Sequence, residues 1–297
     1  MTRSDTQAIA LDALSRIMRV VPNSLPGKTR LARLVLRPFS QRHPFFLSDR
    51  FGNRLAVPSL KEPISVGLFA CGVYEPDTVT AVVDHLNAYG TFLDVGANIG
   101  AVALPVAVRR PAAQIICIEA DPGIASLLQK NVEANRRPNI RIAQCVAGPE
   151  NVEIDFYAAP AANFGMGSVG PQFYAAGEKL RQRKLDDVLD ELGIDNVDIA
   201  KFDIEGAELG AFKGFMRRLT GDRPPVIVFE FADWAESRIP GQIAGSAQNL
   251  LLSCGYSLFR MMRGGTAVGL EQPMTSGGAM ILAVRARIHP TRELGAA

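Results

Sequence analysis

The segment at residues 91–100 constrains the fold of this chain more than any other feature. It reads Thr-Phe-Leu-Asp-Val-Gly-Ala-Asn-Ile-Gly, an apolar run that predicts a buried strand, followed by a turn with two glycines and then a helical pattern. Because glycine has no Cβ, Gly96 and Gly100 let the backbone come close to a ligand that a side chain would block. A strand, a glycine turn and a helix in this order predict a nucleotide-cofactor pocket in an α/β fold.

The carboxylate of Asp94, at the end of this strand, narrows the choice of cofactor. A pyrophosphate site of the dinucleotide type uses G-x-G-x-x-G and free backbone N–H groups, and a nearby aspartate would repel the phosphates. This chain has D-x-G-x-N-x-G instead. S-adenosylmethionine has no phosphate and carries a sulfonium and an α-ammonium, so an acidic residue suits it. The pattern predicts that Asp94, Gly96, Asn98 and Gly100 bind S-adenosylmethionine; the alternative is a tight turn with a structural role.

The length of 297 residues suits one large α/β domain with extensions, because it leaves little room for two full domains. The four cysteines form no C-x-x-C pair and the three histidines share no metal-ligand spacing, which favours buried thiols and argues against a zinc site. No apolar run is long enough to span a bilayer, and the N-terminus does not resemble a signal peptide. We therefore expect a cytoplasmic protein. The net charge of +2 gives no general attraction to nucleic acid.

Charge is uneven along the chain, since the first 54 residues are locally basic. Apolar residues at helical spacing between positions 9 and 21 predict an amphipathic helix that ends at Pro22. This arm is interpreted either as a helix docked on the core with a solvated charged face, or as a surface that attracts anionic substrate or lipid head groups through weak peripheral contact. Its basic residues are Arg3, Arg16, Arg19, Lys28, Arg30, Arg33, Arg37, Arg42, Arg50 and Arg54, against Asp5, Asp12 and Asp49.

Apolar periodicity and breaker residues predict the other elements. Residues 51–57 are typical of a hairpin edge, and residues 64–71 of a short apolar strand or buried segment. The helix at 99–110 contains Pro105, which is expected to kink it. Residues 152–179 predict a strand with mobile loops. Further strands are predicted at residues 115–119, 140–147, 197–204 and 226–231, and helices at residues 76–86, 122–135, 184–192 and 207–219.

The end of the chain departs from strand–helix alternation. Strands at residues 256–262 and 279–285 have only a Gly264-Gly265 turn and loop between them, which predicts an antiparallel hairpin. The predicted fold is therefore α/β: a Rossmann-like class I methyltransferase with a doubly wound, mostly parallel seven-stranded sheet and a C-terminal antiparallel hairpin. Three regions are expected: a basic helical N-terminal extension at 1–50, lead-in strands and a helix at 51–90, and the methyltransferase domain at 91–297.

A second acidic residue follows the next strand. Glu119 lies 119 − 94 = 25 residues beyond Asp94, where a carboxylate can accept hydrogen bonds from both ribose hydroxyls. The alternative is a helix-capping role, which Asp121 before Pro122 also fits. The neighbouring Ala120 is predicted to contact the cofactor. Val146, after the third strand, is expected near the adenine ring.

The third motif is Lys-Phe-Asp-Ile-Glu-Gly-Ala-Glu at residues 201–208, at the end of the fourth predicted strand. Lys201 can pair with one acid, and Glu208 can complement the following helix. Asp203 and Glu205 are then predicted to face the site of methyl transfer as the catalytic carboxylates, with Asp203 also near the cofactor. Alternatively, they hold the methionine moiety or cap the helix. A divalent metal is not predicted, because no further ligand is clearly placed.

The motifs together resemble the FkbM family of S-adenosylmethionine-dependent methyltransferases. The similarity rests on D-V-G-A-N-I-G at 94–100, I-E-A-D-P at 118–122, K-L-D-D-V-L at 184–189 and K-F-D-I-E-G-A-E at 201–208, and it spans about residues 50–285. Membership implies O-methylation of a hydroxyl on a sugar, glycan, glycolipid or natural product. The matching segments at 72–75 and 223–230 contain Tyr74, Glu75 and Glu230, which we expect to contact the acceptor. Ala120, where the family more often has proline, and Pro105 depart from the pattern.

A hydroxyl nucleophile needs a base to remove its proton, and Glu205 and Asp203 are the candidates. The expected partner is a small-molecule or glycan acceptor rather than nucleic acid, because the basic arm has no interleaved aromatic residues. Two alternatives remain open. One is a non-catalytic module that binds S-adenosylmethionine, and the other is a nicotinamide-dependent oxidoreductase.

Overall fold

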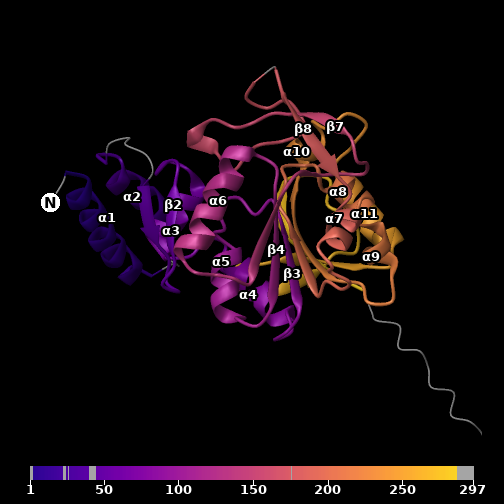
Figure 1. Cartoon of the computed structure of the whole chain (residues 1–297), viewed down its shortest axis with the longest axis horizontal. Coiled ribbons are helices and arrows are strands. Elements are labelled where there is room, and N and C mark those ends of the chain that lie inside the picture. Colours follow the sequence, from indigo (N-terminus) through magenta and orange to yellow (C-terminus); the bar gives the residue numbers. More distant parts are fainter. Residues whose placement is uncertain (1–2, 23–24, 26, 40–44, 175, 286–297) are drawn as a thin grey trace, which may run out of the picture.

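A central eight-stranded sheet organises the molecule (Figure 1). The computed structural model describes residues 3–22, 25, 27–39, 45–174 and 176–285. The strand order is β12-β11-β13-β10-β9-β3-β4-β5. The parallel strands are β3 (Thr91–Val95), β4 (Gln114–Glu119), β5 (Ile140–Gln144), β9 (Ile199–Phe202) and β10 (Val226–Ala232). Their order places the carboxyl ends of β3, β4 and β9 side by side.

The parallel strands are apolar on both faces because helices cover both. In β3, Phe92 belongs to one core cluster, whereas Leu93 and Val95 belong to the other. The first cluster includes residues of α4 (Pro76–His85), α5 (Ala103–Arg109) and α6 (Pro122–Ala134). The second includes residues of α7 (Leu185–Glu191), α8 (Glu208–Lys213), α9 (Met216–Thr220) and α11 (Ser246–Ser253). The doubly wound, mostly parallel sheet is confirmed.

The C-terminal strands are antiparallel, as predicted. The strand β13 (Gly278–Val284) lies between β10 and β11 (Ser257–Met261) and pairs antiparallel with both. The intervening loop adds β12 (Ala267–Gly269) at the edge, so the sheet has eight strands where seven were predicted. The sequence prediction also missed α11 and the short α10 (Asp233–Glu236), which precede this end of the sheet.

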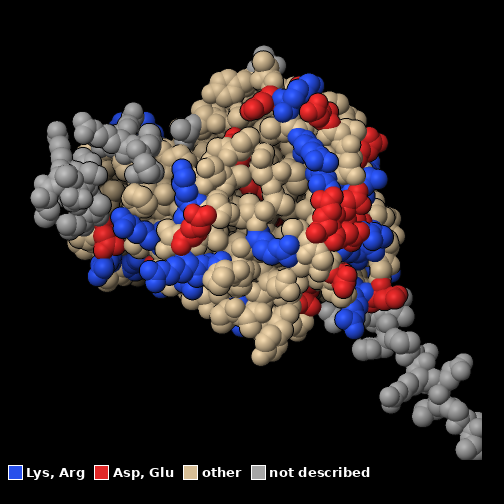
Figure 2. Space-filling view, viewed as in Figure 1, with Lys and Arg blue, Asp and Glu red and all other residues tan. Residues whose placement is uncertain are grey.

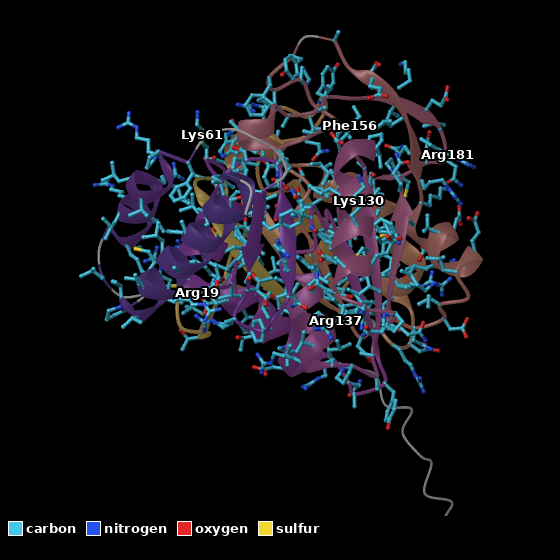
Figure 3. All side chains as sticks on the ribbon, turned by 60° about the vertical axis from the view of Figure 1, so that its left-hand side comes forward. Arg19, Lys61, Lys130, Arg137, Phe156 and Arg181 are labelled. Atoms are coloured by element: carbon cyan, nitrogen blue, oxygen red, sulfur yellow. The ribbon has the colours of Figure 1, made fainter. Side chains whose placement is uncertain are left out.

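The N-terminal residues form a layer against α6 and the first core cluster. This N-terminal layer contains α1 (Arg3–Val20), α2 (Lys28–Leu36), the hairpin of β1 (Phe45–Ser48) and β2 (Arg54–Val57), and α3 (Pro63–Cys71). Both α1 and α2 pack on α3. Arg19, labelled in Figure 3, donates hydrogen bonds from α1 to the carbonyl oxygens of Ser48 and Leu68. The hairpin prediction at 51–57 is confirmed by β1 and β2.

Residues 64–71 form a helix, so their interpretation as a strand was wrong and the alternative of a buried segment holds. The Glu62 side chain accepts a hydrogen bond from Ile64 N at 2.6 Å, Pro63 occupies the first turn, and Gly72 ends the helix at φ 69°. These are start and stop signals of a helix. The almost entirely apolar composition of this largely buried helix hid them from a periodicity argument.

The predicted kink at Pro105 was also wrong. Residues 99–102 still belong to the turn, and α5 begins at Ala103. Pro105 therefore lies in the first helical turn, where a backbone N–H has no intrahelical acceptor to lose.

Two predicted elements are each divided in the structure. The helix at 207–219 breaks into α8 and α9 at Gly214, where a Cβ would lie 2.1 Å from the carbonyl oxygen of Gly148. The strand at 140–147 ends at Gln144. Its last residues form β6 (Val146–Ala147), which joins a small sheet with β8 (Glu178–Arg183) and β7 (Glu153–Phe156).

Within the described residues, no single helix has the length and apolar character needed to cross a membrane; α3 and α4 meet such a test only when taken together, and they are bent by 82°.

Candidate active site

The glycine turn after β3 is held tightly against β4 and β9. The backbone N–H groups of Gly96 and Ala97 both donate to the carbonyl oxygen of Ile118, at 2.9 and 3.1 Å. A Cβ on Gly96 would lie 2.0 Å from the carbonyl oxygen of Asp203, and the residue has φ 77°. Glycine is therefore required here by another chain segment as well as by any ligand. Gly100 lies beneath the turn, where a Cβ would meet the Leu128 side chain at 2.9 Å.

Glu119 closes the other side of the turn. Its two carboxylate oxygens accept hydrogen bonds from Asn98 N at 2.8 Å and from Asp121 N at 2.9 Å. Burial raises the pKa of Glu119 to about 7. Asp121 caps α6 by accepting from Gly123 N and Ile124 N. The helix-capping role therefore belongs to Asp121, and Glu119 is available to a ligand.

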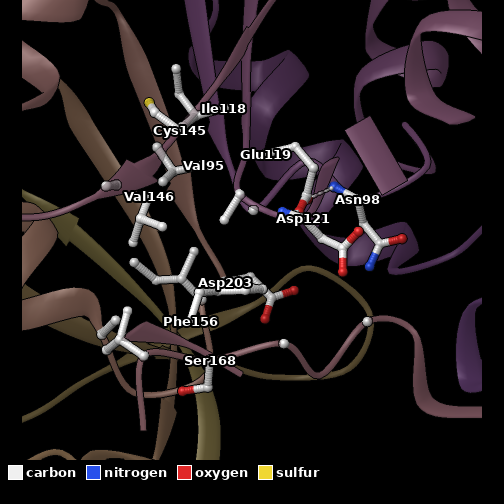
Figure 4. A pocket seen from close by; sticks show the side chains of 18 of the residues that line it. Val95, Asn98, Ile118, Glu119, Asp121, Cys145, Val146, Phe156, Ser168 and Asp203 are labelled. Atoms are coloured by element: carbon white, nitrogen blue, oxygen red, sulfur yellow. Dashed lines mark hydrogen bonds between the residues drawn. The ribbon is translucent and has the colours of Figure 1, made fainter. Parts of the chain in front are cut away.

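These groups line a first cavity at the ends of β3 and β4 (Figure 4). Ala120 and Val146 line it as well, whereas Gly100 does not. Loop residues around Gly165 cover one side of it. The lining is Val95, Gly96, Asn98, Ile118, Glu119, Ala120, Asp121, Cys145, Val146, Ala147, Phe156, Phe164, Gly165, Gly167, Ser168, Val169, Asp203, Ile204 and Ala207.

A second cavity adjoins the first, and the two share Gly96, Asn98, Gly165 and Asp203. Asp203 is the shared residue with an ionisable side chain, so it stands where the cavities meet. The other residues that line the second cavity are Glu62, Pro63, Ile64, Tyr74, Ala97, Ala101, Val102, Met166, Lys201, Glu205, Glu230 and Trp234.

Three carboxylates gather at this junction. Oxygens of Asp203, Glu205 and Glu230 all lie within 4.8 Å of one another. Burial, with the charge of Asp203, raises the pKa of Glu205 to about 8. The charge of Asp203, with burial, raises the pKa of Glu230 to about 9. Protonated carboxyls are thus favoured at Glu205 and Glu230 near neutral pH, and each can donate a hydrogen bond.

The backbone at Glu205 contributes to this arrangement. Glu205 has φ 55°, in the left-handed region that non-glycine residues rarely occupy, and one of its oxygens is buried without a hydrogen-bond partner. The next residue, Gly206, has φ 96° and packs directly on the Ala235 backbone of α10. The tight turn after β9 aims the Glu205 carboxyl into the second cavity.

Asp94 lies behind the cavities rather than in them. Its side chain is fully buried and lines neither cavity. Across the ladder between β3 and β9 its register partner is Lys201, whose Nζ lies 3.6 Å from Asp94 Oδ1 and 3.3 Å from Asp203 Oδ2. Burial raises the pKa of Asp94, although Lys201 opposes this. The cation that faces Asp94 in the structure is therefore a lysine of the protein.

Of the residues expected to contact the acceptor, two line the second cavity and one lies behind its lining. Tyr74 and Glu230 line the second cavity, but Glu75 does not. Glu75 precedes α4 with φ 45°, and burial, with the charge of Asp203, raises its pKa to about 7. It therefore acts on the junction through charge, from behind the lining.

Sequence reasoning missed Glu62 and Trp234. Glu62 caps α3 and lines the second cavity, and burial raises its pKa to about 7. The Glu62-Pro63 pair is a helix-start signal that could have identified it. Trp234 lines the same cavity from α10, with Arg238 4.6 Å from the centre of its ring. No motif pointed to Trp234.

The argument against a metal was that no third ligand was placed, and Glu230 removes that argument. Three carboxylates at these distances could hold a divalent ion. The raised pKa values of Glu205 and Glu230 weaken them as ligands, because coordination requires the deprotonated form. The absence of a metal requirement stays a prediction.

Comparison with known proteins relates the chain to methyltransferases. The sequence model of the protein family described as the methyltransferase FkbM domain matches residues 94–258 of the chain. Over 200 residues the chain is 28% identical to the 2-O-methyltransferase NoeI of Sinorhizobium fredii. The aligned region covers 59% of this chain and 81% of that relative.

Solved structures give more distant likenesses of fold. Precorrin-6y C5,15-methyltransferase from Geobacter metallireducens has a TM-score of 0.42 and 14% identity over 72% of this chain and 92% of that chain. TYW2 from M. jannaschii in complex with AdoMet has a TM-score of 0.39 and 12% identity over 82% and 87%.

Proposed function

The chain belongs to the FkbM family of methyltransferases, and from this premise we propose that it transfers a methyl group to a hydroxyl of a sugar-containing acceptor bound in the second cavity. As a member of this family it is an S-adenosylmethionine-dependent enzyme. The observation that carries the proposal is the position of Asp203, which lies on both cavities with Glu205 and Glu230 beside it.

The first cavity fits the cofactor. Glu119 offers a buried carboxylate to ribose hydroxyls at the end of β4, and the apolar side chains of Ile118 and Val146 suit an adenine ring. Asn98 and Asp203 supply polar groups where the first cavity meets the second, and these groups suit the methionine moiety. The acidic side chains among these residues would repel a phosphate group, but S-adenosylmethionine has none.

The lining of the second cavity suits a polyhydroxylated acceptor. Trp234 and Tyr74 present aromatic surface, and the carboxyl groups of Glu62, Glu205 and Glu230 can donate or accept hydrogen bonds with hydroxyls. The name of the relative NoeI specifies methylation of an oxygen, which supports an O-methyltransferase.

The cofactor supplies a methyl group on a sulfonium, and its transfer is an in-line displacement in which the C–O bond forms as the S–C bond breaks. The protein therefore has to orient the hydroxyl, exclude water and accept a proton. We assign the base to Asp203, which forms an ion pair with Lys201 at the junction. Glu205 and Glu230, in their protonated forms, hold neighbouring hydroxyls of the acceptor. With the cofactor held by Glu119, Asn98 and Asp203, Asp203 would accept the hydroxyl proton, and the electron pair of the S–C bond would stay on the cofactor sulfur.

The first experiment is calorimetric titration of the purified protein with S-adenosylhomocysteine, repeated on Glu119→Ala and Asp94→Ala. We expect micromolar binding, with a loss of about tenfold or more in Glu119→Ala, whose carboxylate lines the first cavity. In Asp94→Ala we expect a smaller loss, because the carboxylate lies behind the lining. If the wild-type protein is folded but does not bind S-adenosylhomocysteine, the assignment of the first cavity to S-adenosylmethionine is contradicted.

The second experiment is an acceptor screen with methyl-labelled S-adenosylmethionine on sugars, glycans and glycolipids, with Asp203→Asn as the control variant. We expect Asp203→Asn to bind S-adenosylhomocysteine and to lose turnover by about 100-fold or more. Cofactor binding without turnover on any acceptor would favour the non-catalytic module. Binding of NADH in place of S-adenosylhomocysteine would favour the oxidoreductase.

A further inference from the structure

The segment from the end of α1 through α2 exposes an unusual amount of apolar side chain. In most of the described chain, large apolar residues are buried in the core, yet this short segment leaves several of them in solvent. Those exposed are Ile17 (64%), Val20 (83%), Leu25 (48%), Leu31 (44%) and Leu34 (60%).

Basic side chains interleave with these apolar groups. On α2, Lys28, Ala32 and Leu36 form the buried face, which packs on α3. The exposed face carries Arg30, Arg33 and Arg37, spaced three and four residues apart so that they project from one side of the helix. The helix contains no acidic residue, and among the described residues no ion pair is formed by these three arginines.

Some arginines elsewhere in the described chain are neutralised. Arg217 and Arg218 form ion pairs with Asp186 and Asp190 on α7 and its C-terminal end, at 2.6 to 3.9 Å. Figure 2 shows acidic and basic groups side by side over α7 and α9, whereas the N-terminal layer shows mainly basic groups. The positive charge of α2 is therefore available to an external anion.

The helix α2 packs on α3, whose N-terminal end lies at the second cavity. Glu62 caps α3 and lines that cavity, and Arg33 is near enough for its charge to oppose the burial that raises the Glu62 pKa. An anionic surface bound by α2 would thus lie close to the second cavity. The carboxylates inside that cavity would repel anions, so such a surface would bind to α2 rather than at the cavity.

We propose that the N-terminal face, formed by the five exposed apolar residues and Arg30, Arg33 and Arg37, binds the surface of a membrane that contains anionic lipids. Apolar side chains on such a face enter the boundary between head groups and acyl chains, and guanidinium groups contact the lipid phosphates. Residues 17–37 contain no aromatic side chain for stacking on bases, which disfavours nucleic acid as the occupant. Docking in this way brings acceptors carried on lipids to the second cavity.

The test is co-sedimentation of the full chain with vesicles of phosphatidylcholine alone and of phosphatidylcholine mixed with phosphatidylglycerol. We expect binding to the anionic vesicles only, weakening as salt is raised. Combined Arg30→Gln, Arg33→Gln and Arg37→Gln should reduce the binding by about 100-fold, because each basic residue near an anionic surface contributes a factor of about five. The control removes the same charge elsewhere, from exposed Arg109, Lys130 and Lys213. It should lower binding less than threefold.

A second variant, Leu31→Asn with Leu34→Asn, tests the apolar contribution. Both side chains are exposed, so the fold should tolerate the change, and unchanged thermal unfolding verifies this. We expect vesicle binding to fall while its dependence on salt persists. The proposal is overturned if the wild type does not bind anionic vesicles, if the control variant loses as much binding as the α2 variant, or if single-stranded RNA at the same salt binds more tightly than the vesicles. None of these measurements requires an acceptor, so failure here leaves the proposed methyl transfer untouched.

Discussion

At the scale of single residues, Lys201 is a buried cation that faces two carboxylates. It is almost fully buried, and its ammonium group faces Asp94 and Asp203 at the carboxyl ends of two neighbouring strands. Burial alone would lower the pKa of Lys201, but the two aspartates and Glu75 raise it. The lysine is therefore charged, and it offsets part of the negative charge at the junction of the two cavities.

Replacing this lysine with an apolar side chain of similar length tests that role. We expect Lys201→Met to lower the free energy of unfolding by about 3–5 kcal/mol at neutral pH, because it leaves buried carboxylates without a cation. The loss should shrink as the pH falls, since Asp94 in the variant takes up a proton at a higher pH in the folded than in the unfolded chain. Urea unfolding across the pH range measures both effects. A loss that is independent of pH would indicate packing alone, and the exposed Lys213→Met serves as control.

Gly96 allows a matched test of close approach. Gly96 and Gly193 both have positive φ, at 77° and 68°, but only at Gly96 would a Cβ meet backbone, at 2.0 Å from Asp203 O. We expect Gly193→Ala to lower the free energy of unfolding by about 1 kcal/mol and to leave S-adenosylhomocysteine binding intact. Gly96→Ala should be more destabilising and should also reduce binding, because β9 must shift. Equal effects in the two variants would show that backbone strain alone matters.

Glu230 should make stability depend on pH. Its pKa is raised to about 9 in the folded chain from an ordinary value near 4.5, by the charge of Asp203 and by burial. Between these values the folded state binds more protons than the unfolded state, so this contribution to stability is complete below about pH 4.5 and is lost as the pH rises to about 9. We expect Glu230→Gln to stabilise the protein by about 1–3 kcal/mol at pH 9 and to change little at pH 5. Thermal unfolding measures this, and exposed Glu150→Gln should show no such trend.

At the scale of elements, Asn131 of α6 and Asn135, the C-cap of α6, join the N-terminal hairpin to this helix. Asn131 is buried; its Oδ1 accepts from Ala56 N at 2.8 Å, and its Nδ2 donates to Ala56 O and Ile99 O at 3.2 and 3.0 Å. Asn135 makes the equivalent pair of bonds with Arg54 nearer to solvent. The side-chain amides thus continue the ladder of β2, and Asn131 also fixes the cofactor turn at Ile99.

The difference in burial predicts different costs for the two positions. We expect Asn131→Ala to lower the free energy of unfolding by about 2–4 kcal/mol, because it leaves buried backbone groups unpaired. Asn135→Ala should cost about 1 kcal/mol, since water can replace the lost bonds. Chemical denaturation gives both values, and amide exchange in β2 should accelerate more in Asn131→Ala. Similar costs at both positions would contradict the role of burial.

At the scale of the whole molecule, the N-terminal layer shares one core with the sheet. Leu11 and Met18 of α1, and Leu36 of α2, belong to the same cluster of buried residues as Phe92 of β3 and Leu128 of α6. The layer is therefore expected to unfold together with the sheet, although the sequence suggested a separate extension at 1–50.

Coincidence of two probes tests this. The fluorescence of Trp234, the single tryptophan, reports on the second cavity, and amide exchange in α1 reports on the layer. We expect both to change at the same denaturant concentration, as in a two-state transition. Earlier loss of protection in α1 would show that the layer is an independent unit.

The sequence by itself determined the elements whose signals are local. The glycine turn, the acidic residues at the ends of β4 and β9, the start of α6 at Asp121-Pro122 and the antiparallel end of the sheet depend on backbone geometry and short-range hydrogen bonds. They were therefore predictable, and so were the doubly wound fold and the cofactor. The same reasoning failed at residues 64–71 and at Pro105, where burial on all sides or the exact start of a helix outweighed periodicity.

Only the tertiary structure decided which charges face each other. Lys201 lies 107 positions from Asp94 in the sequence, and their pairing follows from the register of β3 with β9. Glu230 joins Asp203 and Glu205 because β10 is the next strand of the sheet, and Glu62 reaches the second cavity because α3 packs against it. Electrostatic and desolvation energies depend on distances between groups that are remote in sequence. For that reason the motifs identified the carboxylates, but only the folded chain showed that the pKa values of Glu205 and Glu230 are raised and that Asp203 is paired with the lysine.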